Sequence, residues 1–270
     1  MSIPAIELKD VSCTFLGEYQ GKQVLYTAVR HVNLKVGQGE FVSIVGPTGC
    51  GKSTMLNMSA GLMEPSHGEV RIFGEKLEGL NRRTGYMFQA DSLMPWLTAI
   101  DNVAIGLKYR GAEPKEARAK AEEWIHRVGL AGFEDTYPHH LSGGMRKRVA
   151  MAQTLIMDPD IILMDEPFSA LDIQTRQLME NELLRLWAAK RKAVLFITHD
   201  LDEAIAMSDR VIVMSAGPES HVIGEFPINL PRPRDVAEIR TAREFIELHN
   251  AIWSVLREEV LKGYAQQQKR

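Results

Sequence analysis

The sequence predicts an α/β fold built on a mainly parallel sheet. Short apolar runs rich in β-branched residues recur along the chain, and each is followed by a glycine or a polar residue; they lie at 41–45, 161–164, 194–198 and 211–214. Such runs are typical of strands that are buried on both faces of a parallel sheet. Helical patterns separate them, and this alternation indicates the α/β class.

The stretch from about 90 to 157 has few strand signals, and we interpret it as a helical insertion. Pro114 is suited to the first turn of a helix. Apolar residues then follow at the spacing of one helical face, namely Ala117, Ala121, Trp124, Ile125 and Val128. These residues predict a helix that packs on a core, which says nothing by itself about function.

A proline-rich segment at 230–234 separates the sheet region from the end of the chain. Beyond it, apolar residues again share one helical face: Phe245, Leu248, Ile252, Leu256 and Val260. We therefore expect a main domain over residues 1–230 and a C-terminal helical extension over residues 231–270.

Composition excludes several classes of protein. A net charge of -3 over 270 residues provides no basic field for nucleic acid, and we read the short basic runs at 146–148 and 190–192 as solvated helix faces. Only Cys13 and Cys50 are present, which favours a reducing, cytosolic setting. Because no uncharged apolar run reaches about 18 residues, we expect the chain not to span a membrane.

The strongest chemical signal is a phosphate-binding loop that follows the first buried run. Its pattern, Gly46-x-x-x-x-Gly51-Lys52-Ser53, lies ahead of a helix-prone segment, and the loop consists of Gly46, Pro47, Thr48, Gly49, Cys50, Gly51, Lys52, Ser53 and Thr54. Glycines let successive backbone N–H groups converge on phosphate oxygens, lysine adds a positive charge, and Ser53 can hold Mg²⁺. The loop predicts a nucleoside triphosphate ligand.

Two carboxylates, Asp165 and Glu166, follow the apolar run at 161–164. They are therefore expected at the carboxyl edge of the same sheet, where open α/β folds bind ligands. Phosphoryl transfer needs charge neutralisation and a positioned nucleophile. We assign Asp165 to the metal and Glu166 to the attacking water, which predicts hydrolysis.

A third element, Leu141-Ser142-Gly143-Gly144-Met145, opens a predicted helix. A serine hydroxyl and two glycines at a helix N-terminus form a second anion site. Here the chain resembles the ATP-binding subunits of ATP-binding cassette (ABC) transporters, which carry this signature. The resemblance implies a P-loop NTPase cassette with an N-terminal antiparallel β subdomain and a helical signature subdomain. It also implies that Ser142, Gly143 and Gly144 contact the ATP held by the P-loop of a second subunit.

Further motifs follow the family order: Gln89, Ser169-Ala170-Leu171-Asp172 and His199. The resemblance implies that Gln89 contacts Mg²⁺ or the attacking water and that His199 acts with Glu166 on the γ-phosphate. It also implies an aromatic residue stacked on adenine. Phe15 fits that position, while Tyr19 and Tyr26 compete for the role. Two departures are Gln153, where relatives usually carry Arg, and a longer segment around Tyr19.

Branch-level features resemble importers of nitrate, sulfonates and taurine: Phe88-Gln89, Met94-Pro95-Trp96-Leu97, Met145 and the Leu-Pro-Arg-Pro-Arg segment at 230–234. The resemblance implies an ATPase with ATP and Mg²⁺ as cofactors, peripheral on the cytoplasmic face of the inner membrane. Its implied partners are a second ATPase subunit, identical or closely related, two transmembrane permease subunits that contact the region of Pro95 and Trp96, and indirectly a solute-binding protein. The alternative is a soluble single-cassette ATPase such as an iron–sulfur assembly factor. The sequence leaves the solute open.

Overall fold

The computed structural model describes residues 3–19 and 21–267. In this part of the chain the central element is a sheet of six strands in the order β10-β9-β3-β8-β7-β6. Neighbouring strands from β9 to β6 are parallel, and β10 lies antiparallel at the edge. The strands are β3 (Phe41–Val45), β6 (Thr84–Met87), β7 (Ile161–Asp165), β8 (Ala193–Ile197), β9 (Arg210–Met214) and β10 (Val222–Pro227). The predicted parallel sheet is confirmed.

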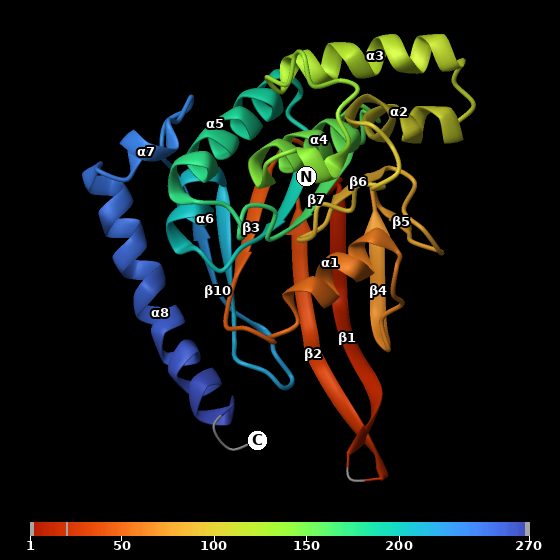
Figure 1. The fold of residues 1–270 in the computed structure, drawn as a ribbon. Coiled ribbons are helices and arrows are strands. Elements are labelled where there is room, and N and C mark those ends of the chain that lie inside the picture. The colour runs from red at the N-terminus through yellow and green to blue at the C-terminus, as the bar shows by residue number, and fades with distance from the viewer. Residues whose placement is uncertain (1–2, 20, 268–270) are drawn as a thin grey trace.

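A second, antiparallel sheet contains the N-terminal strands in the order β2-β1-β4-β5. Its strands are β1 (Ile6–Tyr19), β2 (Lys22–Val36), β4 (His67–Ile72) and β5 (Glu75–Lys76). β1 and β2 form a long hairpin that projects from the body of the molecule (Figure 1). The register of this hairpin shifts at several points between Leu8 and Thr14, so β1 is strongly irregular in its middle.

Helix α1 (Lys52–Ala60) lies between the two sheets and contacts strands of both. An apolar cluster that includes Ile44, Met55 and Leu56 fills this space. A second cluster lies on the other face of the central sheet, beneath the remaining helices. These are α2 (Ala99–Tyr109), α3 (Pro114–Arg127), α4 (Gly143–Leu155), α5 (Ile173–Lys190), α6 (Leu201–Met207) and α7 (Val236–Ile239), with a 3₁₀ turn at Pro138–His140. The helical region predicted at about 90–157 corresponds to α2, α3 and α4.

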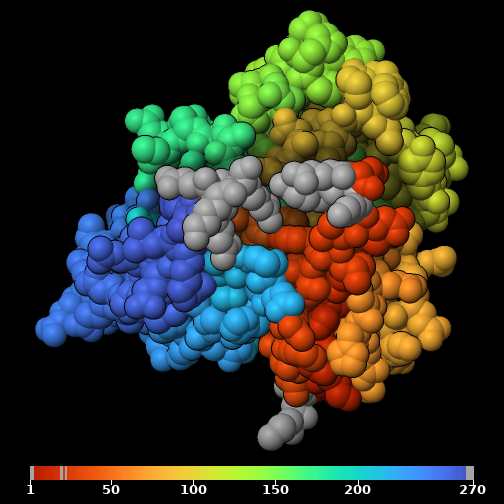
Figure 2. Space-filling view, turned by 90° about the horizontal axis from the view of Figure 1, so that it is seen from below, coloured from red at the N-terminus to blue at the C-terminus, as the bar shows by residue number. Residues whose placement is uncertain are grey.

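The C-terminal helix α8 (Arg243–Gln267) runs along the side of the molecule, against α6, β9 and β10 (Figure 1). In the space-filling view this blue segment lies beside the light-blue segment that precedes it (Figure 2). Phe245, Ile252 and Leu256 are buried in the same cluster as the core of the central sheet. The extension therefore shares the core of the main domain, and the division at residue 230 stays a prediction.

Within the described residues, the helices are all too short or too polar to traverse a lipid bilayer.

Candidate nucleotide site

The P-loop connects β3 to α1, as the sequence predicted. Gly51 is the N-cap of α1 and has a φ of 87°, and a Cβ at this position would lie 2.5 Å from Cγ1 of Val29. Only glycine fits both constraints. Among the described residues, no side chain caps this helix, and its first turn contains no acidic residue. The N-terminus of α1 is thus suited to an external anion, because its N–H groups are not taken up by a capping side chain within residues 3–19 and 21–267.

Lys52 lies over the P-loop and is buried. Its Nζ donates to the backbone oxygens of Gly46 and Pro47, each at 2.9 Å. Burial of Cys50 within the loop raises the pKa of its thiol, so Cys50 stays in the neutral form. The loop thus presents to a phosphate the positive charge of the Lys52 ammonium, and the neutral Cys50 thiol adds no negative charge beside it.

Ser53 and Asp165 meet where α1 begins and β7 ends. The hydroxyl of Ser53 donates to Oδ1 of Asp165 at 3.1 Å. Burial raises the pKa of the Asp165 carboxyl, and the nearby Glu166 carboxylate acts in the same direction. A hydroxyl and a carboxylate brought together beside a phosphate loop are the oxygen ligands that Mg²⁺ uses in nucleotide sites. The residues present therefore fit the predicted metal.

Glu166 occupies a strained position directly after β7. Its φ of 44° is rare for a residue with a side chain, and such strain is commonly found at functional sites. Nε2 of Gln89 lies 3.4 Å from Oε2 of Glu166, and Nδ1 of His199 lies 3.2 Å from the same oxygen. The structure thus brings together the three residues that the sequence assigned to the water and the γ-phosphate.

The 169–172 motif makes two hydrogen bonds of its own, one of them to Glu166. The hydroxyl of Ser169 donates to the backbone oxygen of Glu166 at 3.0 Å, so the segment after β7 folds back on the strained residue. Asp172 caps α5 by accepting from the backbone N–H of Thr175 at 3.0 Å. Both residues belong to the 169–172 motif.

The signature residues lie at the start of α4. Ser142 is the N-cap and its Oγ accepts from the backbone N–H of Met145 at 3.3 Å. Ser142 and Gly143 are exposed, whereas a Cβ on Gly144 would lie 2.7 Å from Cγ2 of Thr175. Within residues 3–19 and 21–267, the side-chain hydrogen bonds of Ser142 do not reach the P-loop. The structure therefore leaves this second anion site facing outward.

The expectation that the basic run 146–148 is a solvated face is wrong. Lys147 is only 3% exposed and donates to the backbone oxygen of Gln89, and its Nζ lies 3.1 Å from Oδ1 of Asp91. Arg146 Nε donates to Oδ2 of the same aspartate at 2.9 Å. Asp91 lies two residues after Gln89, so the run ties the glutamine loop to the signature helix. Three consecutive basic residues gave no sign of burial, because the carboxylate that pairs with them, Asp91, is 55 residues before Arg146 in the sequence.

The aromatic candidates for adenine occupy the β1–β2 hairpin. Phe15 and Tyr26 are directly paired across the two strands and so lie on the same face. The Tyr26 hydroxyl is 3.5 Å from where a Cβ on Gly217 would lie, and that position is also 3.1 Å from the backbone oxygen of Gly49. The side chain of Tyr19 lies outside the described residues. Phe15 thus stays a prediction, with Tyr26 beside it.

Sequence reasoning missed Asn102, a fully buried residue of α2. Its Oδ1 accepts from the backbone N–H of Met94 at 2.7 Å, and its Nδ2 donates to the oxygens of Met94, Leu97 and Thr98 at 3.0 to 3.1 Å. Asn102 therefore fixes the loop that presents Trp96, which is 71% exposed. An asparagine in the first turn of an apolar helix, eight residues after Met94, was the available signal.

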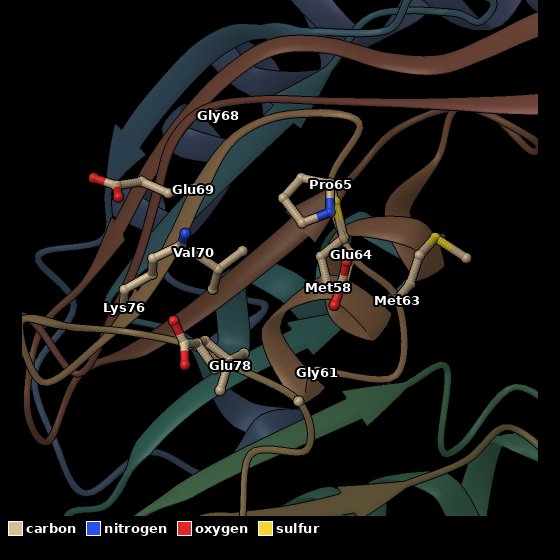
Figure 3. A pocket seen from close by; sticks show the side chains of 12 residues that line it. Met58, Gly61, Met63, Glu64, Pro65, Gly68, Glu69, Val70, Lys76 and Glu78 are labelled. Carbon is tan, nitrogen blue, oxygen red and sulfur yellow. The ribbon is translucent and has the colours of Figure 1, made fainter.

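Sequence reasoning also missed that α8 approaches the P-loop. A hollow of about 320 Å³ has Gly46, Pro47, Thr48 and His199 on one wall, and on the other the α8 residues Trp253, Leu256, Val260, Gly263 and Tyr264. A separate hollow of about 380 Å³ lies between β4, β5 and the end of α1, where Glu69, Lys76 and Glu78 surround it (Figure 3). This second hollow contains no P-loop residue.

Comparison with known proteins gives a consistent picture. Residues 29–169 match the ABC transporter family. The ABC transporter ATP-binding protein MJ0412 of Methanocaldococcus jannaschii is 45% identical over 96% of this chain and 94% of its own length. The aliphatic sulfonates import ATP-binding protein SsuB of Bacillus cereus is 40% identical over 90% of this chain and 94% of its own length.

Solved structures agree. The dimeric ATP-binding cassette MJ0796 in a post-hydrolysis state, bound to ADP and Pi, superposes with a TM-score of 0.72 and 36% identity, covering 84% of this chain and all of that chain. Another dimeric structure of MJ0796 gives a TM-score of 0.73 at the same identity. With the P-loop, the carboxylate pair, the signature and His199 all in place, the chain belongs to the ABC transporter family and is an ATP-binding, ATP-hydrolysing cassette.

Proposed function

We propose that this chain is the ATPase subunit of an ABC importer that couples ATP binding and hydrolysis to the uptake of a small solute. The observation that supports the catalytic part is the convergence of Gln89 and His199 on one oxygen of Glu166, at 3.4 and 3.2 Å. We assign Glu166 to accept a proton from the attacking water, with Gln89 and His199 holding its carboxylate in position.

The other residues divide the remaining work. The P-loop and Lys52 bind the phosphates, and we assign Mg²⁺ to Ser53, Asp165 and Gln89; the hydrogen bond between Ser53 and Asp165 supports the first two. When bound, the metal neutralises charge on the phosphate oxygens. Phe15 is assigned to the adenine, with Tyr26 as the neighbouring candidate. Stacking on an aromatic ring reads no base edge, so we expect only a modest preference for ATP over GTP.

The catalytic assignment is tested by Glu166→Gln, which keeps the size of the side chain and removes the base. We expect ATP binding to persist while phosphate release falls at least about a hundredfold. Lys52→Ala is the contrasting variant, because it should weaken binding of the nucleotide itself. Normal steady-state turnover in Glu166→Gln would remove Glu166 from the central role.

We further propose that the working unit is a dimer, either of this chain or with a close relative. The outward-facing Ser142 and Gly143 support this, because an exposed anion site at a helix N-terminus can contact the phosphates that the P-loop of a second subunit holds. The dimeric MJ0796 structures support the same arrangement. In light scattering, Glu166→Gln should dimerise on ATP addition. Adding Gly143→Arg should abolish the dimer while nucleotide binding persists; a dimer that survives this change contradicts the arrangement.

The membrane partners are proposed from the exposed loop around Trp96 and from the importer subunits among the relatives. Two permease subunits would bind this region, placing the chain peripherally on the cytoplasmic face of the inner membrane, with a solute-binding protein on the other side. The proposed solute belongs to the nitrate, sulfonate and taurine class.

Co-purification from detergent-solubilised membranes tests this assembly. Trp96→Asp should abolish recovery of the multi-span subunit and transport, while ATPase activity of the isolated chain stays unchanged. Tyr109→Asp is a matched control, since Tyr109 is an equally exposed aromatic residue at the end of α2. Retained transport with Trp96→Asp would contradict the placement. Uptake of an alkanesulfonate and of nitrate in cells that carry the intact operon then distinguishes the solutes.

A further inference from the structure

Three potential metal ligands converge on the antiparallel sheet, away from the nucleotide residues. Asp10 belongs to β1, His31 to β2 and His67 is the first residue of β4. Nδ1 of His31 lies 2.8 Å from Oδ1 of Asp10, and Nε2 of His67 lies 3.1 Å from Oδ2. All the ligand atoms lie within 4.8 Å of one another. The three residues come from three adjacent strands, so their approach depends on the sheet and not on neighbouring sequence.

The backbone at this point is irregular in a way that brings these side chains together. Asp10 and His31 have φ values of 53° and 49°, and both lie where the strand register shifts. Gly68, next to His67, has a φ of 82°, and a Cβ there would lie 2.2 Å from the backbone oxygen of Asp10. Asp and His tolerate the left-handed region better than most residues, but each still costs free energy there.

Hydrogen bonds hold the irregular backbone in place. The backbone N–H of Asp10 donates to Oδ1 of Asn33 at 3.0 Å, and that of His31 donates to Oγ of Ser12 at 3.0 Å. The side chains of Asp10, His31 and His67 are 50 to 62% exposed. Exposed ion pairs contribute little to stability, so the contacts among the three residues do not explain why strained positions are kept.

We propose that Asp10, His31 and His67 form a binding site for a divalent transition-metal ion, with Zn²⁺ as the ion it takes. Two imidazole nitrogens and one carboxylate oxygen are a ligand set typical of zinc. A tetrahedral zinc site with bonds of about 2.0 Å separates its ligand atoms by about 3.3 Å. The two histidines are hydrogen-bonded to different oxygens of Asp10, at 2.8 and 3.1 Å, so a bound ion replaces these two contacts with only a small opening of the cluster. Solvent supplies the fourth position because the cluster is open to it.

The charges around the cluster permit a cation. The basic residues next to Asp10 and His31 in the sequence are already paired, Lys9 with Glu69 at 3.3 Å and Arg30 with Glu219 at 2.7 Å. His31 also lines an open hollow of about 480 Å³, which gives an ion access from solvent. The bound ion would fasten β1, β2 and β4 to one another at the point where their register is least regular.

The test uses the full chain, treated with a chelator, freed of nucleotide and then kept in excess Mg²⁺, so that Ser53 and Asp165 of the P-loop site are not left open to Zn²⁺. Calorimetric titration with Zn²⁺ should show one equivalent bound, and Co²⁺ should give the visible bands of a low-coordinate site. Zn²⁺ should also raise the melting temperature, because it binds the folded state.

His67→Ala and His31→Ala should each weaken Zn²⁺ binding by at least about tenfold and remove the thermal shift, because each deletes a direct ligand. His126→Ala should change neither. That control is matched, since His126 is 57% exposed and pairs with a carboxylate, Glu134, on the distant helical region.

If His31→Ala disturbs the strained strand, the test depends on Zn²⁺ binding by His67→Ala, because the backbone of His67 is not in the left-handed region. Zn²⁺ binding that survives in both variants, or its absence from the wild-type chain in the micromolar range, would overturn the proposal. ATP binding in Mg²⁺ should be unaffected in all three variants, so failure here leaves the nucleotide site intact.

Discussion

Replacement of Asn102 should release the loop that carries Trp96 without touching the nucleotide residues. The Nδ2 group of Asn102 has two protons, which are shared among three backbone oxygens, and its Oδ1 accepts one further hydrogen bond. Among the described residues the side chain therefore makes the equivalent of three hydrogen bonds. At about 1 kcal/mol each, Asn102→Ala should lower the free energy of unfolding by about 3 kcal/mol. That loss is a large share of the free energy of unfolding of a typical domain, which is roughly 5–15 kcal/mol.

Asn102→Asp sharpens the test because it keeps the shape and replaces the amide by a buried carboxylate that faces three backbone oxygens. We expect a loss greater than that of Asn102→Ala, since an unpaired buried charge is added to the lost donors. Urea denaturation measures the free energies, and hydrogen exchange over residues 94–98 should accelerate in both variants. Asn250→Ala, on the exposed side of α8, is the control and should change stability little. A loss below about 1 kcal/mol in Asn102→Asp would refute the reasoning.

Three further predictions concern the core of the cassette. Lys147→Met keeps the buried stem but removes the ammonium that contacts Gln89 and Asp91, so ATP turnover should fall while nucleotide affinity is kept. Phosphate release measures the turnover, and Lys120→Met on the exposed face of α3 is the control. An unchanged rate in Lys147→Met would contradict this prediction. Gly51→Ala should be more destabilising than Gly49→Ala in thermal unfolding, because both have positive φ but only the Cβ at 51 meets Val29; equal losses would show that the contact does not matter. Burial raises the pKa of Glu203 well above its usual range, so the folded state keeps that proton to higher pH than the unfolded state and loses stability as pH rises through the folded pKa. Relative to the wild type, Glu203→Gln should therefore stabilise the protein increasingly as pH rises above the ordinary pKa of a glutamate, and a gain independent of pH would contradict the assignment.

The sequence was sufficient wherever the signal was local. Apolar runs predicted the strands β3, β7, β8 and β9, and the glycine spacing predicted the P-loop. The strands β6 and β10 are only partly buried and were not predicted. Asp165 and Glu166 could be placed at the sheet edge because strand ends share that edge. His199 and Gln89 were located by family resemblance, and their approach to Glu166 is a property of the fold.

What could not be predicted depends on contacts between distant segments. Lys147 is buried because Asp91 comes to it from the end of another element, and its immediate neighbours in sequence are themselves basic. The Asp10, His31 and His67 cluster depends on register shifts in a long hairpin, which leave no trace in periodicity. Similarly, the approach of α8 to the P-loop follows from the packing of the whole helix on α6, β9 and β10.

The hollow between α8 and the P-loop contains a tryptophan whose intrinsic fluorescence can report on the nucleotide site. The chain contains four tryptophans, and Trp253 lines that hollow together with Pro47, Thr48 and His199. Indole emission depends on the polarity around the ring, and Trp253 is 42% exposed. Arrival of a nucleotide or of a second subunit at the P-loop changes the water around this ring. With the other three tryptophans replaced by phenylalanine, the emission of Trp253 alone should follow the state of the site during turnover, with no attached dye.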